Sequence, residues 1–230
     1  MRKGGKGMGL FSRKECDVCK KKLSLAEGLK CLDGSICSEC KKKMSPLFTD
    51  YKNTPIEKIK EHLVYREANK SRVKEFVASA TYGEYPKVLI DEKHNWFVLS
   101  KQPKLMEENP DVFDFKDVKD FSFHVEQSKR ELHFTNKKGR TCSYKPARYE
   151  FLYQAKFNIL MDHPFIQDIS IRMTQNDVKI ISEMADKEKN EQTNENYQKM
   201  LESAKSLRQV FEAHKKNVFN KIINDGHKYF

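Results

Sequence analysis

Long apolar runs are absent from this sequence. No stretch of the 230 residues approaches the roughly 18 consecutive apolar side chains that a membrane-spanning helix requires. The basic residues near the N-terminus are not followed by the apolar segment of a secretory signal. We therefore expect a soluble, cytoplasmic protein, in which closely paired cysteines favour a metal over disulfides.

Recognisable catalytic motifs are absent as well. The chain has no Gly-rich phosphate-binding loop, no nucleophile elbow and no recognisable Ser/His/Asp order. Its seven histidines form no HExxH or HxxxH motif. One acidic stretch lacks the spacing of a calcium loop and is expected to be a charged loop. Its carboxylates are Glu107, Glu108, Asp111, Asp114, Asp117 and Asp120. The sequence therefore predicts a protein that is not an enzyme.

Positive charge is in excess and unevenly distributed. The formal net charge is +11, and four thiolates around one divalent ion would change it by about −2. Residues 1–43 hold 12 Lys/Arg and 5 Asp/Glu, a net +7, whereas residues 44–230 hold 32 and 28, a net +4. An anionic partner should therefore meet the N-terminal part of the chain first.

Four of the six cysteines form two Cys-x-x-Cys pairs separated by 17 residues. Each pair supplies two thiolates to one side of an ion, and structural zinc takes four such ligands in a tetrahedron. Asp33 and Gly34 predict a hairpin that brings the second pair to the first. The sequence therefore predicts one structural Zn²⁺ ion. Its ligands are Cys16, Cys19, Cys37 and Cys40.

The cysteines are less suited to other roles. A redox Cys-x-x-Cys usually precedes a helix in a βαβ unit, and the sequence predicts no such unit. Cys31 belongs to neither pair and is expected to fill the small core of the module. Cys142 is expected in a strand, as a small buried side chain.

The spacing of apolar residues predicts an α+β protein: a small N-terminal zinc ribbon, a helical connector, and an antiparallel β domain, pleckstrin-homology-like, with a C-terminal helix. Thr54 and Glu57 match a capping box and predict a helix over residues 55–77. From Lys87 the period becomes two, which predicts six or seven strands, including a long one over 149–161. The last helix, from about residue 195, is expected to pack on the sheet and not to form a coiled coil.

The predicted boundaries follow these patterns. They are a basic disordered tail at 1–14, the zinc ribbon at 15–45, the helical connector at 46–84, the antiparallel β domain at 85–175, and a linker with the C-terminal helix at 176–230. Within them, residues 101–110 are expected to form a loop and residues 187–196 a polar linker. We also hypothesise that Met8 is the native start and that residues 1–7 are an extension.

Two features of the predicted β domain have alternative interpretations. A hairpin turn at Ser128 and Lys129 would place His124 opposite His133. Such a pair can bind a metal, but we prefer a solvated pair. The turn at 136–140 forms a basic hairpin tip, and in the pleckstrin-homology architecture such tips can contact lipid phosphates; we prefer a solvated turn. The basic residues of the tip are Lys137, Lys138 and Arg140.

Four segments of the chain resemble one known family. They are CDVCKKKLSL, LDGSICSECKKKMSP, TPIEKIKEHLVYREANKSRVKEF and ENPDVFDFKDV. They are similar to bacterial proteins of unknown function that carry the domain of unknown function 4428. The resemblance covers the first 80 residues and, loosely, the β-rich middle. It implies a four-cysteine zinc ribbon and no activity, and Lys20 departs from the Gly that many such modules place after the first turn. The cysteine count and separation alone also resemble DNA-binding fingers of the GATA type.

The sequence thus predicts a non-enzymatic zinc-ribbon protein that acts as an interaction module toward a protein or an anionic membrane surface. The alternative is a nucleic-acid-binding protein that uses its basic N-terminal zinc module, with an affinity that falls steeply with salt. The candidate phosphate contacts are Lys3, Lys6, Arg13, Lys14, Lys20, Lys21, Lys22, Lys41, Lys42 and Lys43. No small-molecule substrate is inferred.

Overall fold

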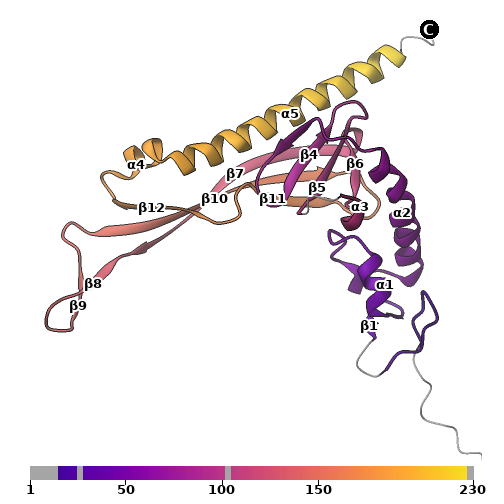
Figure 1. The fold of residues 1–230 in the computed structure, drawn as a ribbon, viewed down its shortest axis with the longest axis horizontal. Helices are drawn as coiled ribbons and strands as arrows, with labels where there is room; N and C mark the ends of the chain where they lie inside the picture. Colours follow the sequence, from indigo (N-terminus) through magenta and orange to yellow (C-terminus); the bar gives the residue numbers. More distant parts are fainter. Residues whose placement is uncertain (1–14, 25–27, 102–104, 227–230) are drawn as a thin grey trace, which may run out of the picture. The chain divides into compact units, whose positions relative to one another are not determined.

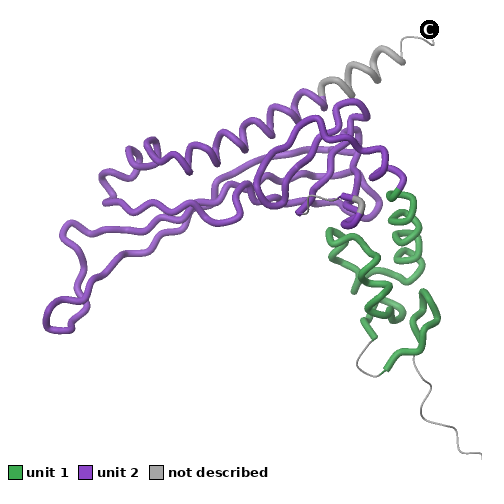
Figure 2. Tube along the Cα trace, viewed as in Figure 1, with its two compact units in different colours: residues 1–70 green, residues 71–230 purple. Residues whose placement is uncertain are grey.

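The computed structural model describes residues 15–24, 28–101 and 105–226. The predicted tail at 1–14 lies outside these residues. The chain divides into two compact units, residues 1–70 and residues 71–230 (Figure 2).

No described helix has both the length and the apolar character needed to cross a membrane.

The described part of unit 1 is built from short elements. Strands β1 (Leu29–Lys30) and β2 (Ser35–Ile36) form the hairpin that Asp33 and Gly34 predict. Helix α1 (Ser38–Lys43), a 3-10 turn (Tyr51–Asn53) and the start of α2 (Ile56–Glu75) follow. Apart from cysteines, the buried apolar side chains of this part are Leu23, Ile36, Met44, Phe48, Ile56 and Ile59. So few apolar residues make only a small core, and folding of such a unit needs another source of stability.

Helix α2 begins where the sequence predicts a helix, but its described hydrogen bonds differ from the predicted capping box. The hydroxyl of Thr54 donates to the carbonyl oxygen of Asp50 at 2.7 Å. The N–H of Ile56 donates to Oδ1 of Asp33 at 2.8 Å. The first turn of α2 is therefore capped by the loop of the β1–β2 hairpin, a tertiary contact that local sequence spacing does not indicate.

The described part of unit 2 contains two four-stranded antiparallel sheets (Figure 1). The first has the order β3-β4-β5-β6, with β3 (Ala80–Tyr82), β4 (Lys87–Asp91), β5 (Trp96–Ser100) and β6 (Val112–Asp114). The second contains β7 (Val118–Glu131), β10 (Arg148–Met161), β11 (Asp168–Arg172) and β12 (Val178–Glu183). Strand β10 pairs with β7 on one side, and with β12 and then β11 on the other.

Smaller elements complete unit 2. Strands β8 (His133–Thr135) and β9 (Thr141–Ser143) form a two-stranded hairpin in the connection from β7 to β10. The helical elements are α3 (Leu105–Glu108), a 3-10 turn (Phe115–Asp117), α4 (Lys187–Thr193) and α5 (Glu195–Gly226). The antiparallel sheets and the C-terminal helices confirm the predicted α+β class.

The core of unit 2 lies where α5 packs on the second sheet. Alternate side chains of β10 are buried, as predicted for this long strand. They are Phe151, Tyr153, Ala155, Phe157, Ile159 and Met161. On α5, Met200, Ala204, Leu207 and Phe211 are buried at helical spacing. The described part of α5 therefore packs on a sheet, as predicted.

The predicted hairpin turn at Ser128 and Lys129 is wrong. Strand β7 continues through both residues and pairs with β10, with Lys129 opposite Phe151. His124 lies opposite Lys156 and His133 opposite Ser143, so the histidines do not face each other across a strand pair. Ser is common in turns, but neither Ser128 nor Lys129 readily adopts the positive φ that a two-residue hairpin turn needs and that Gly and Asn tolerate.

The turn predicted at residues 136–140 is confirmed, and the N–H of Asn136 donates to the carbonyl oxygen of Arg140 there. Its Gly139 has a φ of +73°, which favours glycine.

Other secondary-structure predictions also need correction. Strand β3 lies in the predicted helical connector, α3 in the predicted loop at 101–110, and β12 and α4 in the predicted linker after residue 175. In β12, buried Val178 and Ile180 alternate with polar Lys179, but the exposed Ile181 interrupts the apolar-polar alternation. A short amphipathic strand with one outward apolar residue has too weak a pattern to be recognised.

Asp91, at the end of β4, is a buried carboxylate inside unit 2. Its Oδ2 accepts from the N–H of Val77 at 2.8 Å and lies 2.7 Å from Nδ1 of His94. The N–H of His94 donates to Oδ1 at 3.1 Å. Burial by itself raises the pKa of Asp91, but these hydrogen bonds outweigh it and hold the pKa below its usual range.

We expect Asp91→Asn to destabilise unit 2 by about 2 kcal/mol near neutral pH, because hydrogen bonds to a charged group are lost. An unfolded aspartate has a pKa of about 3.9. The carboxylate therefore contributes stability above that pH and loses it as the pH falls through the lower folded pKa. Urea unfolding followed by Trp96 fluorescence gives the free energy of unfolding of each protein. The difference in this free energy between Asp91→Asn and wild type should be smaller in strong acid than near neutral pH. Glu92→Gln, at the exposed neighbouring position, is the control. An equal cost at both pH values would contradict this assignment.

Candidate functional site

The four cysteines predicted as ligands converge in unit 1. Cys16 and Cys19 lie in the turn closed by the bridge between Glu15 and Lys22. Cys37 is the N-cap residue of α1, and Cys40 lies within that helix. All four Sγ atoms lie within 4.8 Å of one another, as in a zinc ribbon.

The sulfur positions suit a tetrahedral ion. The Sγ atoms of Cys16 and Cys40 are 3.8 Å apart, and those of Cys19 and Cys37 are 3.7 Å apart. A zinc–sulfur bond of about 2.3 Å places tetrahedral ligands about 3.8 Å from one another. A disulfide needs about 2.05 Å. The spacing therefore fits four thiolates around one metal ion and not two disulfides.

Backbone N–H groups and burial set the electrostatics of the cluster. The N–H of Cys37 donates to Sγ of Cys16, and that of Cys40 donates to Sγ of Cys37, each at 3.3 Å. Burial opposes ionisation of Cys16, but backbone donors that include Cys19 and Cys37 lower its pKa to about 6. Burial and the neighbouring sulfurs raise the pKa of Cys40. Four thiolates this close repel one another, so a divalent cation is needed to ionise them all.

Beyond the hairpin at Asp33 and Gly34, the contacts that hold the two cysteine turns together were not predicted from the sequence. The N–H of Ser35 donates to Oδ2 of Asp17 at 2.8 Å, and the N–H of Asp17 donates to the carbonyl oxygen of Ser35 at 2.9 Å. A Cβ at Gly34 would lie 2.6 Å from Oδ2 of Asp17 and 2.7 Å from Cγ1 of Ile56. Gly34 is therefore needed for close packing as well as for the hairpin. The only local signal was the position of Asp17 between the first two ligands.

Lys20 adopts a backbone conformation that glycine favours. Its φ is +61°, and its N–H donates to the carbonyl oxygen of Cys16 at 2.8 Å. This geometry gives a physical reason for the Gly expected after the first cysteine turn, because a side chain is strained at positive φ. Lys20 nevertheless closes the same turn around Cys16.

The two remaining cysteines lie outside the cluster. Cys31 is buried in the β1–β2 turn, and its burial raises the pKa of its thiol, as suits the predicted core position. Cys142 lies in β9 as predicted but is only half-buried, with the side-chain amide of Asn136 3.2 Å from its sulfur.

The acidic stretch was predicted to be a charged loop, but most of it lies in α3, β6, the following 3-10 turn and the start of β7, where its carboxylates make structural contacts. Asp114 accepts from the N–H of Lys116 at 3.0 Å and caps a 3-10 turn. Glu108 accepts a hydrogen bond from the hydroxyl of Ser100. Within the described ranges, the group of three or more potential ligands that could hold a metal is the four-cysteine cluster.

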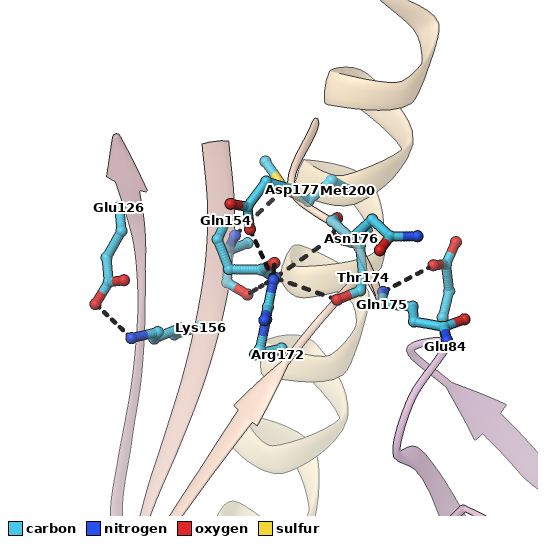
Figure 3. A network of polar contacts seen from close by, with 11 residues as sticks. Glu84, Glu126, Gln154, Lys156, Arg172, Thr174, Gln175, Asn176, Asp177 and Met200 are labelled. Atoms are coloured by element: carbon cyan, nitrogen blue, oxygen red, sulfur yellow. Dashed lines mark hydrogen bonds and ion pairs between the residues drawn. The ribbon is translucent and has the colours of Figure 1, made fainter. Parts of the chain in front are cut away.

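A second feature lies on the face of β10 opposite the buried one. A hollow of about 670 Å³ opens there in unit 2. Its lining residues are Glu126, Gln127, Ser128, Leu152, Gln154, Lys156, Arg172 and Asp177. Figure 3 shows Arg172 between Gln154 and Asp177. Its guanidinium donates to Oε1 of Gln154 at 2.6 and 3.0 Å and lies 2.7 Å from Asp177. The charged groups of this face are thus pre-ordered.

Apolar side chains flank this polar face. Leu160 in β10 is 43% exposed and Ile181 in β12 is 54% exposed. Lys156 and Glu126 form an ion pair at 2.7 Å between neighbouring strands. The face therefore combines ordered charges with exposed apolar residues, a composition found in protein–protein interfaces.

Comparison with known proteins identifies the N-terminal module. Fold and site together define a module with four clustered cysteines, spaced as in a zinc ribbon, followed by an α+β unit. Residues 14–62 match the family model described as "Domain of unknown function (DUF4428)", which confirms the resemblance for this part of the chain. No curated protein and no solved structure matched the chain in the same comparisons. The likeness of unit 2 to the pleckstrin-homology architecture stays a prediction.

Proposed function

We propose that the protein binds one structural Zn²⁺ through its four clustered cysteines and acts as a non-enzymatic interaction module. The observation that carries this proposal is the tetrahedral spacing of four sulfurs. Four protein ligands fill the coordination sphere of zinc and leave no position for a substrate, which favours a structural role. Zinc contributes about 10–16 kcal/mol at comparable sites, enough to fold a unit with a small core.

The partner surface in this proposal is the open face of the second sheet of unit 2, and the partner is a protein. Support comes from the pre-ordered Arg172 and Lys156 and from the exposed Ile181 and Leu160 on the same face. Apolar anchors surrounded by polar groups are the usual anatomy of such interfaces.

Native mass spectrometry of the full chain from its own cells tests both parts of the proposal. We expect a mass one zinc heavier, minus the displaced protons, and a bound protein that survives moderate salt. Ile181→Asp should release that protein. Val64→Asp is the matched control, because Val64 is 70% exposed but lies in unit 1. A metal-free mass with two disulfides, or equal release by both variants, would contradict the proposal.

A second candidate function is nucleic-acid binding by unit 1, supported by exposed lysines close in sequence to the ligands. These are Lys20, Lys21, Lys22, Lys42 and Lys43. Lys41 is half-buried, its ammonium group lies 4.3 Å from the ring centroid of Tyr51, and burial lowers its pKa, so it is less available to a phosphate. Lys3, Lys6, Arg13 and Lys14 lie outside the described residues. Recovery of nucleic acid at low salt only, instead of a protein, would favour this candidate.

A further inference from the structure

The connection between β7 and β10, together with the first residue of β10, is a strongly basic arm, which we define as residues 132–148. It contains β8 and β9, which lie beyond the end of the second sheet of unit 2 (Figure 1). Its 17 residues include five Lys/Arg and no Asp/Glu. The five are Lys137, Lys138, Arg140, Lys145 and Arg148, and all are exposed. The body of the sheet differs, because there Glu150 pairs with both Arg130 and Lys179. The arm thus carries a concentrated positive charge without acidic residues of its own.

The tip of the arm has a defined conformation. Oδ1 of Asn136 accepts from the N–H groups of Lys138 and Arg140 at 2.9 and 3.1 Å. The N–H of Asn136 donates to the carbonyl oxygen of Arg140 at 2.9 Å, and Gly139 takes the positive φ that closes the turn. The three cations of the tip are therefore held on a closed turn, which lowers the entropy cost of binding a ligand.

The two faces of the arm differ in chemistry. The register places Phe134 opposite Cys142 on one face, and Thr135 opposite Thr141 on the other. The rings of Phe134 and Tyr144 lie 5.0 Å apart, and Phe134 is 41% exposed. The guanidinium of Arg148 lies 5.1 Å from the ring centroid of Tyr144. A partly exposed aromatic pair therefore lies along the arm between the cations of its tip and those of its base.

We propose that this arm binds single-stranded nucleic acid, with a base stacked on Phe134 and phosphates contacted by the cations of the tip and base. Single-strand-binding surfaces combine positive charge that follows the backbone with aromatic rings on which bases stack.

An anionic membrane is the other polyanion that the positive charge of the arm would suit. The turn Asn136, Lys137, Lys138, Gly139, Arg140 has no apolar side chain to enter a bilayer, and the exposed aromatic residue lies on the side of the arm. The site goes beyond the proposed function, because it lies in unit 2 and includes no metal ligand.

Fluorescence anisotropy with the full-length, zinc-loaded protein and a short labelled DNA strand tests the proposal. The triple variant Lys137→Gln, Lys138→Gln, Arg140→Gln should lower the slope of log affinity against log salt by about 2, at about 0.7 per lost phosphate contact. Phe134→Ala should weaken binding about tenfold without changing that slope, and Phe134→Trp should restore it. The unit 1 control, Lys20→Gln, Lys21→Gln, Lys22→Gln, removes the same charge from the surface of the second candidate function and separates the two sites. Binding by the arm predicts that this variant keeps its affinity within about twofold.

Three outcomes would overturn the proposal. The first is an unchanged salt slope in the arm triple variant together with unchanged affinity in Phe134→Ala. The second is loss of binding in the unit 1 control alone, which would place nucleic acid on the cysteine module. The third is arm-dependent binding to vesicles of anionic phospholipid, or to duplex DNA, in preference to the single strand. Retention of a protein partner by the arm variants would leave the proposed function standing, so the two proposals fail separately.

Discussion

Replacement of Cys37 by serine should abolish stoichiometric metal binding and unfold unit 1, while unit 2 keeps its fold. Cys37 supplies one of four sulfurs within 4.8 Å, and its Sγ also accepts the N–H of Cys40 at the start of α1. Serine retains an acceptor at this N-cap position, so the helix cap is preserved and the loss is that of a metal ligand. Without the metal, up to about 10–16 kcal/mol of binding free energy is no longer coupled to folding.

Two measurements separate the units in this experiment. Native mass spectrometry gives the metal content, and hydrogen exchange of peptides from residues 15–54 reports on unit 1. Trp96, the single tryptophan of the chain, lies in β5 and reports on unit 2. Cys142→Ser is the matched control, because Cys142 is a half-buried cysteine outside the cluster. Retention of one metal ion by Cys37→Ser, or its loss from Cys142→Ser, would show that the ligands are misassigned.

Truncation of Phe211 to alanine should destabilise unit 2 by about 3–5 kcal/mol, the usual cost of removing a large buried aromatic side chain. Phe211 is 1% exposed on α5. Its ring lies 5.0–5.5 Å from four other phenylalanine rings, and the partners are Phe97, Phe115, Phe121 and Phe157. These partners come from both sheets and a 3-10 turn, so one truncation leaves a cavity where all of them meet.

Chemical denaturation followed by Trp96 fluorescence measures this loss. Phe134→Ala is the control, because it is the same substitution at a ring that is 41% exposed in the arm. We expect it to lower the free energy of unfolding by less than about 1 kcal/mol. Metal content should be unchanged in both variants, since neither residue belongs to unit 1. A cost for Phe211→Ala no larger than that of the control would mean that α5 does not contribute to the core as described.

The metal ligands could be predicted from sequence because their chemistry is local. Two Cys-x-x-Cys turns each present two thiolates, and the length between them lets the turns meet. The tertiary contacts that orient these turns could not be predicted in the same way. Asp17 binds Ser35, Asp33 caps α2, and Gly34 leaves room for Ile56. These contacts join residues that are 18 to 23 positions apart. The helix and strand periods of the sequence cover only neighbouring positions and therefore do not indicate such contacts.

The strands show the same division. The long apolar alternation of β10 identified its buried face, because a period of two is a property of the strand itself. The alternation did not indicate which strand pairs with β7. A turn at Ser128 and Lys129 was as compatible with the alternation as a continuous strand, and it would have paired the two histidines.

By itself, the sequence determined the four-cysteine cluster, the α+β class, the helix that begins near residue 56 and the buried faces of β10 and α5. Each of these follows from side-chain chemistry repeated at short intervals. Only the tertiary structure decided the register of β7 against β10, the separation of His124 from His133, and the contacts of Phe134 and Tyr144 beside the basic hairpin tip. Those features depend on which strands pair, and pairing is selected by the free energy of the whole packed sheet and not by any single segment.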